Sequence, residues 1–146
     1  MRPLQKIAAL TALITAAALM FAAVASADYT VPLGYGCSVT AQTPIETSHA
    51  LTFSGHTTCP GGDGNVNKYL KVSAMVDWNG TWVDIPNQSG SGWSGWDKGL
   101  FGVAFGGYPC QPGASYATDV VVGLYGNGWG GGGEVQSWQN YSVKKC

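Results

Sequence analysis

Hydrophobic and polar residues alternate with a period of two along much of the chain, which is typical of half-buried β-strands. The clearest example is Lys68–Trp78, in which Leu70, Val72, Ala74, Val76 and Trp78 share one face and Lys71, Ser73, Met75 and Asp77 the other. The pattern predicts seven strands: Tyr35–Gln42, His49–Thr57, Lys68–Trp78, Thr81–Ile85, Lys98–Phe105, Tyr116–Tyr125 and Glu134–Lys145. Short strands joined by Gly-rich turns indicate an all-β chain folded as an antiparallel β-sandwich.

The dipeptide Asn79-Gly80 separates the third and fourth predicted strands. Both residue types accept positive φ, so this is a strong signal for a two-residue hairpin. The turn then sets three cross-strand pairs whose side chains are expected to face inward: Trp78–Thr81, Val76–Val83 and Ala74–Ile85. The following segment, Pro86–Asp97, is rich in Gly, Ser and Trp, and we expect a loop there.

The first 27 residues have the pattern of a secretion signal. Arg2 and Lys6 form a basic start, residues 7–24 are almost wholly apolar, and Ala25-Ser26-Ala27 is a small-x-small cleavage site. An uncleaved membrane anchor is the alternative, but the apolar run is rich in Ala and contains two threonines. We therefore expect a signal peptide over 1–27 and a secreted, extracellular domain over 28–146.

The charge after residue 27 is weakly acidic. Five lysines and eight acidic residues follow it, so the net charge is 5 − 8 = −3, and no arginine is present there. Phosphate-rich partners are bound through Arg and Lys clusters. The composition thus argues against nucleic acid and against a membrane once the signal is cleaved, and we expect a monomer.

The segment Pro112-Gly113-Ala114-Ser115-Tyr116 leads into a strand with Val120, Val122 and Leu124 on one face. It resembles the corner before the sixth strand of immunoglobulin-like and fibronectin-III-like sandwiches, where a Tyr hydroxyl binds backbone just upstream. Over roughly Cys37 to Cys146, the chain resembles the small secreted Ig-like proteins of high-GC Gram-positive bacteria, a group without one shared activity. Its sixth predicted strand lacks the cysteine of the antibody-type bridge.

The four cysteines of a secreted chain are expected to form two disulfides. In an Ig-like strand order, Cys37 and Cys59 lie at one pole and Cys110 and Cys146 at the other. A strand of eight residues spans about 26 Å, whereas bridged Cα atoms lie within about 7 Å. This order implies Cys37–Cys59 and Cys110–Cys146, which avoid crossing the sandwich.

No catalytic constellation is recognisable. His49 and His56 are seven residues apart near one strand and point to opposite faces, and no Ser lies in a Gly-x-Ser-x-Gly elbow. Asp84 and Asp97 flank one predicted loop and could form a glycosidase-type pair, but surface acids are the simpler interpretation. We assign no catalytic residue and expect the protein not to be an enzyme.

The segment Asp63-Gly64-Asn65-Val66-Asn67 matches the opening of a calcium-binding loop. The match ends at Lys68, where the loop requires Gly, and at Ala74, where it requires Glu. A turn rich in Asx residues explains the segment more simply. We therefore expect no metal and no cofactor.

Two groups of aromatic residues are candidate binding surfaces. The parity of the third, fourth, sixth and seventh predicted strands places Trp82, Tyr125 and Trp138, with Met75, on the outer face of one sheet. Three Gly-rich segments should meet at the pole of Cys37 and Cys59: Pro60–Asn67, Pro86–Asp97 and Gly126–Gly133. Trp93 and Trp96 lie in the second of them and Trp129 in the third. Exposed aromatics suit ligand binding, although loops could cover the first group and the second could pack onto the core.

These observations predict a secreted, non-catalytic binding module for carbohydrate or a cell-surface polymer. An alternative is an extracellular protein-interaction factor, such as an enzyme inhibitor, because Trp and Tyr also anchor protein interfaces. A third possibility is carriage of a small ligand, as in the sandwich apoproteins that hold enediyne antibiotics. Fold alone distinguishes none of these.

Overall fold

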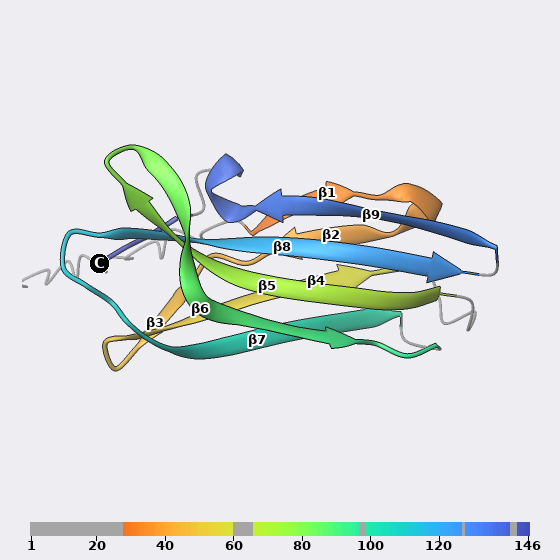
Figure 1. Cartoon of the computed structure of the whole chain (residues 1–146), viewed down its shortest axis with the longest axis horizontal. Helices are drawn as coiled ribbons and strands as arrows, with labels where there is room; N and C mark the ends of the chain where they lie inside the picture. Colours follow the sequence, from red (N-terminus) through yellow and green to blue (C-terminus); the bar gives the residue numbers. More distant parts are fainter. Residues whose placement is uncertain (1–27, 60–65, 97–98, 127, 141–142) are drawn as a thin grey trace, which may run out of the picture.

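Two antiparallel sheets, packed face to face, form the architecture of the computed structural model, which describes residues 28–59, 66–96, 99–126, 128–140 and 143–146 (Figure 1). The first sheet contains β1 (Tyr29–Pro32), β2 (Ser38–Ala41), β3 (Ile45–Thr47), β4 (Ala50–Thr58) and β7 (Leu100–Pro109). The second contains β5 (Val66–Trp78), β6 (Thr81–Trp93), β8 (Ser115–Gly126), β9 (Trp129–Gln136) and β10 (Lys144–Lys145). The all-β prediction is confirmed, but the described residues form ten strands, not the seven of the predicted Ig-like sandwich.

The central strands of the two sheets are β4 and β8. β4 pairs with β7 along one side and with β2 and β3 along the other, and β1 extends the sheet beyond β2. β8 pairs with β5 on one side and with β9 and β10 on the other, and β6 lies outside β5. The second sheet therefore contains the segments that the sequence placed together around the candidate outer face.

The core lies between β4 of the first sheet and β5 and β8 of the second. Its fully buried side chains include Leu51, Phe53, Leu70, Val72, Ala74, Val120, Val122 and Leu124, which confirms the inward parity predicted for these segments. Phe53 also stacks on Phe105 of β7, with ring centroids 5.4 Å apart. The sheets approach closely at Gly55, where an added Cβ would overlap the side chain of Val120.

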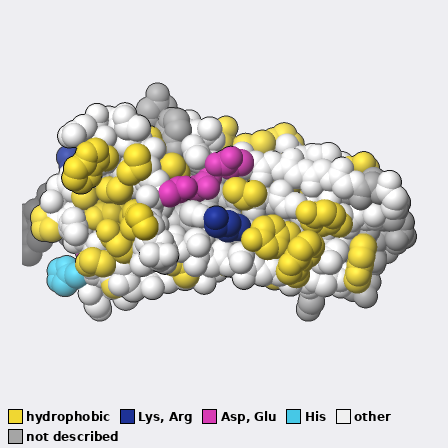
Figure 2. Space-filling model, viewed as in Figure 1, with side chains coloured by type: hydrophobic (Ala, Val, Ile, Leu, Met, Phe, Trp, Pro, Cys, Tyr) yellow, Lys and Arg dark blue, Asp and Glu magenta, His cyan; other side chains and the backbone are white. Residues whose placement is uncertain are grey.

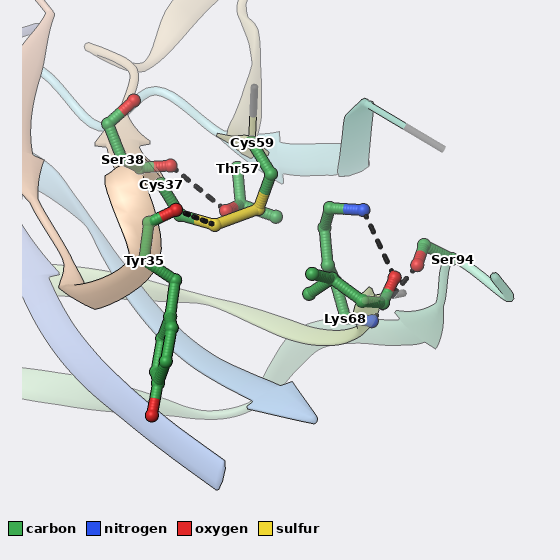
Figure 3. Close-up of a disulfide and its surroundings, with 8 residues drawn as sticks. Tyr35, Cys37, Ser38, Thr57, Cys59, Lys68 and Ser94 are labelled. Carbon is green, nitrogen blue, oxygen red and sulfur yellow. Dashed lines mark hydrogen bonds between the residues drawn. A yellow bond between two sulfur atoms is a disulfide. The ribbon is translucent and has the colours of Figure 1, made fainter. Parts of the chain in front are cut away.

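Both predicted disulfides are confirmed. Cys37–Cys59 joins the start of β2 to the end of β4, with Cα atoms 4.1 Å apart (Figure 3). Cys110–Cys146 joins the segment before β8 to the residue after β10, with a Cα separation of 5.5 Å. The sequence separations are 22 and 36 residues, for which the chain-entropy model gives about 3–4 kcal/mol of stabilisation each.

Tyr116 at the start of β8 is 1% exposed and behaves as its sequence context predicted. The backbone N–H of Gln111, five residues upstream, donates a long hydrogen bond of 3.4 Å to the Tyr116 hydroxyl. The ring also contacts Tyr108 in an edge-to-face arrangement, with centroids 5.8 Å apart. These contacts hold the segment before β8 against the core.

The β5–β6 hairpin confirms the predicted turn but not all of the predicted register. Asn79 and Gly80 have φ of 53° and 82°, and the pairs Trp78–Thr81 and Val76–Val83 are present. The Ala74–Ile85 pair is wrong, because Asp84 pairs with Met75 and Ser89 with Ser73, so residues 85–88 leave the ladder. Trp78 is 68% exposed instead of inward-facing, on a hairpin that curls away from the rest of its sheet (Figure 1).

The predicted loop over Pro86–Asp97 is largely strand, since β6 continues to Trp93. The physical reason is a second alternation, of glycine with serine. Side chains built on Gly90 and Gly92 would contact Val103, Phe105 and Phe101 of β7. The nearest atoms would lie 3.4 Å from the added Cβ, which is ordinary contact, so these inward glycines place β6 directly against the side chains of β7.

The first and last predicted strands are each interrupted. A 3₁₀ turn over Gly34–Gly36, in which Tyr35 has φ of 62°, precedes β2. At the other end, strand β9 stops at Gln136 and a 3₁₀ turn covers Ser137–Asn140. The Ser137 hydroxyl accepts a 2.8 Å hydrogen bond from the backbone N–H of Thr118, which takes the place of a ladder partner.

The predicted signal peptide over 1–27 lies outside the described residues. In the part of the chain that the structure describes, no helix is both long and apolar enough to cross a membrane.

Candidate functional site: an aromatic cluster on the outer sheet face

Three aromatic rings gather on the outer face of the second sheet, and we call Tyr69, Trp93 and Tyr125 the aromatic cluster. The centroid of the Trp93 ring lies 5.2 Å from that of Tyr69 and 5.3 Å from that of Tyr125. The rings are tilted, at interplanar angles of 53° and 41°. Trp93 is 56% exposed and Tyr125 47% exposed, so the cluster presents a contiguous apolar surface to solvent.

Strand register brings the three residues together. Tyr69 on β5 pairs with Trp93 on β6 and, on its other side, with Gly123 on β8. Tyr125 follows Gly123 by two residues, so it has the same parity and points to the same face. Because Gly90 and Gly92 of β6 face inward, the alternation of side chains along the strand directs Trp93 outward.

Glycine keeps the cluster uncovered. The Tyr125 ring lies over Gly123, because a Cβ there would be 2.9 Å from its Cε2 atom. On β9, Gly130 pairs with Tyr125 and Gly132 pairs with Gly123, so the adjoining positions carry no side chain. The rings therefore border a bare strip of backbone.

Polar groups surround the rings. Asn67 pairs with Tyr125 across β5 and β8, and its buried Oδ1 has no hydrogen-bond partner among the described residues. Lys71, two residues along β5 from Tyr69, is exposed. After Trp93, the Ser94 hydroxyl accepts the backbone N–H of Lys68 at 3.0 Å and donates to the Gly95 carbonyl at 2.6 Å, which anchors the end of β6 (Figure 3).

Carboxyl groups occupy the middle of the same face. Asp119 of β8 interacts with Glu134 and Gln136 of β9, and Asp84 of β6 adds to its negative surroundings. Burial first, and then Glu134, raise the pKa of Asp119 to about 7. Figure 2 shows acidic side chains near the middle of the visible face, beside a basic side chain and between two hydrophobic groups.

The structure does not unite the three residues predicted for the outer face. Trp82 pairs with Asp77 and Tyr125 with Asn67, ten residues apart along β5, which corresponds to about 33 Å. They belong to opposite ends of the sheet. Met75 was expected to be exposed beside Trp82, but it is 6% exposed. The Trp138 side chain is outside the described part of the structure.

Of the residues predicted at the pole, Trp93 joins the cluster. Trp96 is 48% exposed and makes no ring contact with another described residue. The side chain of Trp129 and residues 60–65 are not described. One residue from each predicted surface, Trp93 and Tyr125, is thus brought into contact.

Tyr69 was missed by the sequence interpretation. A signal was available, because Tyr69 has the outward parity of Lys71 and Ser73 on β5. Its importance follows only from the continuation of β6 to Trp93, which the sequence did not predict.

The alternative chemical sites gain no support. The described residues contain no group of three His, Cys, Asp or Glu side chains that could hold a metal, and Asp63 and Asp97 are outside that part of the chain. Glu46 bridges His49 at 3.6 Å and Lys144 at 2.9 Å. A hydrogen bond from Lys144 lowers the pKa of Glu46, and we interpret this group as an ion pair joining β3 to β10.

No protein-family model and no curated protein sequence matches this chain.

Proposed function

We propose that this protein is a secreted, non-catalytic module that binds carbohydrate through the aromatic cluster. The observation that carries the proposal is the contact of Trp93 with both Tyr69 and Tyr125 on an exposed sheet face. Sugar rings present apolar faces of C–H groups, which carry partial positive charge. The faces of aromatic rings carry the complementary negative charge, so the two stack favourably.

The polar groups beside the rings supply orientation. Binding sites typically combine an apolar surface with a few placed hydrogen-bonding groups. Asn67 offers an amide next to Tyr125, and Lys71 and Glu134 are exposed one row further along β5 and β9. Hydroxyl groups of a sugar can donate to Glu134 and accept from Lys71.

The ligand class follows from charge and compartment. A net charge of −3 without arginine after residue 27 disfavours polyanions, so a neutral polysaccharide or cell-surface polymer is the proposed partner. Two disulfides fit an oxidising, extracellular location. We further interpret the two-sheet fold as Ig-like, supported by the hydrogen bond to Tyr116.

A protein partner is the second candidate function, and a different surface favours it. Trp78 is 68% exposed and Val83 is 40% exposed on the β5–β6 hairpin. Exposed Trp side chains are common anchors of protein interfaces. In this alternative, the hairpin inserts into a partner and the aromatic cluster plays no part.

Tryptophan fluorescence with soluble oligosaccharides tests the proposal. Wild-type protein is titrated with oligomers of N-acetylglucosamine and of glucose, beside Trp93→Phe and Trp78→Phe variants. We expect saturable quenching that persists in Trp78→Phe and is lost in Trp93→Phe. Quenching retained in Trp93→Phe and lost in Trp78→Phe would move the site to the hairpin.

A further inference from the structure

Asp119 is buried although it lies on the outer face of its sheet. Its side chain is on the same parity as Val121, Gly123 and Tyr125, yet it is only 6% exposed. Oδ1 is buried and has no hydrogen-bond partner among the described residues. Burial removes hydration from the ionised carboxylate, and the Gln136 side chain offsets this loss only in part, so the neutral acid is favoured.

The nearest acidic neighbour is Glu134 on β9. Asp119 pairs with Gln136, and Val121 pairs with Glu134, so the two carboxyl groups are diagonal neighbours across β8 and β9. The Gln136 side chain donates a 3.1 Å hydrogen bond to Glu134 Oε1. This bond holds the Glu134 carboxyl group beside Asp119.

Lysines flank the pair, but among the described residues none forms an ion pair with it. On β6, Asp84 adds negative charge. On β5, Ser73 is directly opposite Asp119, with Lys71 and Asp77 further along the same face. On β10, Lys145 pairs with Ser115, which is four residues from Asp119. In the 3₁₀ turn after β9, the Ser137 hydroxyl accepts a hydrogen bond from the backbone N–H of Thr118. None of these lysines forms an ion pair with Asp119 or Glu134.

We propose that Asp119 and Glu134 share one proton and form a pH-dependent latch between β8 and β9. While Asp119 holds its proton, its carboxyl group donates the O–H to the carboxyl group of Glu134 across the two strands. When the proton leaves to solvent, two carboxylates face each other and the cross-strand hydrogen bond is lost. The edge strand β9 then loosens first, because among the described strands it pairs with β8 alone.

The direction of the pH effect follows from proton binding. The folded chain holds the Asp119 proton up to a pKa of about 7, whereas its ordinary value is 3.8. Between these values the folded state binds more protons than the unfolded state, so the free energy of unfolding falls as pH rises. The stabilisation is complete in acid and is lost as pH passes through 7.

Carbon-13 NMR titration of the Asp119 carboxyl carbon tests the proton directly. We expect a midpoint near pH 7 that is coupled to a shift of the Glu134 carboxyl carbon. A midpoint near 4 would overturn the latch. This test is independent of carbohydrate binding, so it stands or falls separately from the proposed function.

Amide hydrogen exchange and thermal unfolding between pH 5.5 and 8.5 test the consequence. Wild type should lose at least tenfold more exchange protection at β9 than at β4 as pH rises, and its melting temperature should fall. Asp119→Asn should remove most of this pH dependence, whereas Asp77→Asn, which removes an acid from the same face, should retain it. If Asp119→Asn does not fold, Glu134→Gln replaces it. Equal pH dependence in wild type and the latch variant would contradict the proposal.

Discussion

The rings of Trp93 and Tyr125 lie 5.3 Å apart, although their strands are not neighbours. β6 and β8 flank β5, so the contact is made across an intervening strand. Tyr69 on β5 lies 5.2 Å from Trp93 and completes the bridge. Three strands therefore share one aromatic surface, and that surface is the site on which the proposed function depends.

Replacing Gly123 by alanine should disturb the cluster without disturbing the core. The new Cβ would lie 2.9 Å from the Tyr125 ring, so the ring must move from its place beside Trp93. We expect weaker binding of oligosaccharide and a loss of unfolding free energy of at most about 1 kcal/mol. Titration calorimetry and chemical denaturation measure the two effects. Gly131→Ala is the matched control, because nothing lies within 4 Å of its Cβ.

Replacing Gly55 by alanine should disturb the core without disturbing the aromatic cluster. Its Cβ would overlap Val120 and approach the Thr40 carbonyl oxygen to 3.1 Å, so the two sheets must separate. Overpacking of this kind costs about 1–3 kcal/mol, and urea denaturation should show it as a lower midpoint. Gly34→Ala, where the added Cβ meets no atom within 4 Å, should leave the midpoint within about 0.5 kcal/mol of wild type. Equal midpoints for both variants would mean that Gly55 is not a close-approach position.

Removal of the Tyr116 hydroxyl tests the corner before β8. The hydroxyl accepts a hydrogen bond from the backbone N–H of Gln111, and the side chain is buried. Tyr116→Phe should lower the free energy of unfolding by about 1 kcal/mol, since the N–H loses its partner. Tyr108→Phe removes the hydroxyl of the neighbouring, half-buried ring and serves as the comparison. An unchanged midpoint in Tyr116→Phe would show that the bond does not contribute.

Reduction of the two disulfides should destabilise the domain strongly. Each closes a loop of 22 or 36 residues, and together they are expected to contribute about 6–8 kcal/mol in the chain-entropy model. Small domains have about 5–15 kcal/mol of net stability. We expect dithiothreitol to lower the melting temperature by tens of degrees, as measured by circular dichroism. A melting temperature unchanged after complete reduction would contradict this account.

Much of the fold was predictable because local signals and global packing agree. The alternation over Lys68–Trp78 identified β5 and its core face, and Asn79-Gly80 identified the turn that follows. The pairing of Cys37 with Cys59 followed from the assumed Ig-like strand order, which places the ends of two strands at one pole. The first two signals depend on short-range geometry, which the sequence displays directly.

The site was less predictable, for two physical reasons. Residues 85–88 leave the ladder between β5 and β6. The period-two alternation of the sequence gives no sign of such a break. Gly90 and Gly92 are typical of a loop in the sequence, whereas in the structure they face Phe101, Val103 and Phe105 of β7. Without these two features, the approach of Trp93 to Tyr69 and Tyr125 could not be foreseen.

Sedimentation with insoluble polymers tests the central claim most directly. Purified protein is incubated with chitin, cellulose or bacterial cell wall, and Trp93→Ala/Tyr125→Ala is compared with Trp78→Ala, which removes an even more exposed ring at the opposite end of β5. All variants are first shown to be folded by circular dichroism. We predict that at least one polymer removes wild type and Trp78→Ala from solution, and that the double variant stays in the supernatant. Equal sedimentation of the double variant and wild type would contradict the assignment of the aromatic cluster as the binding site.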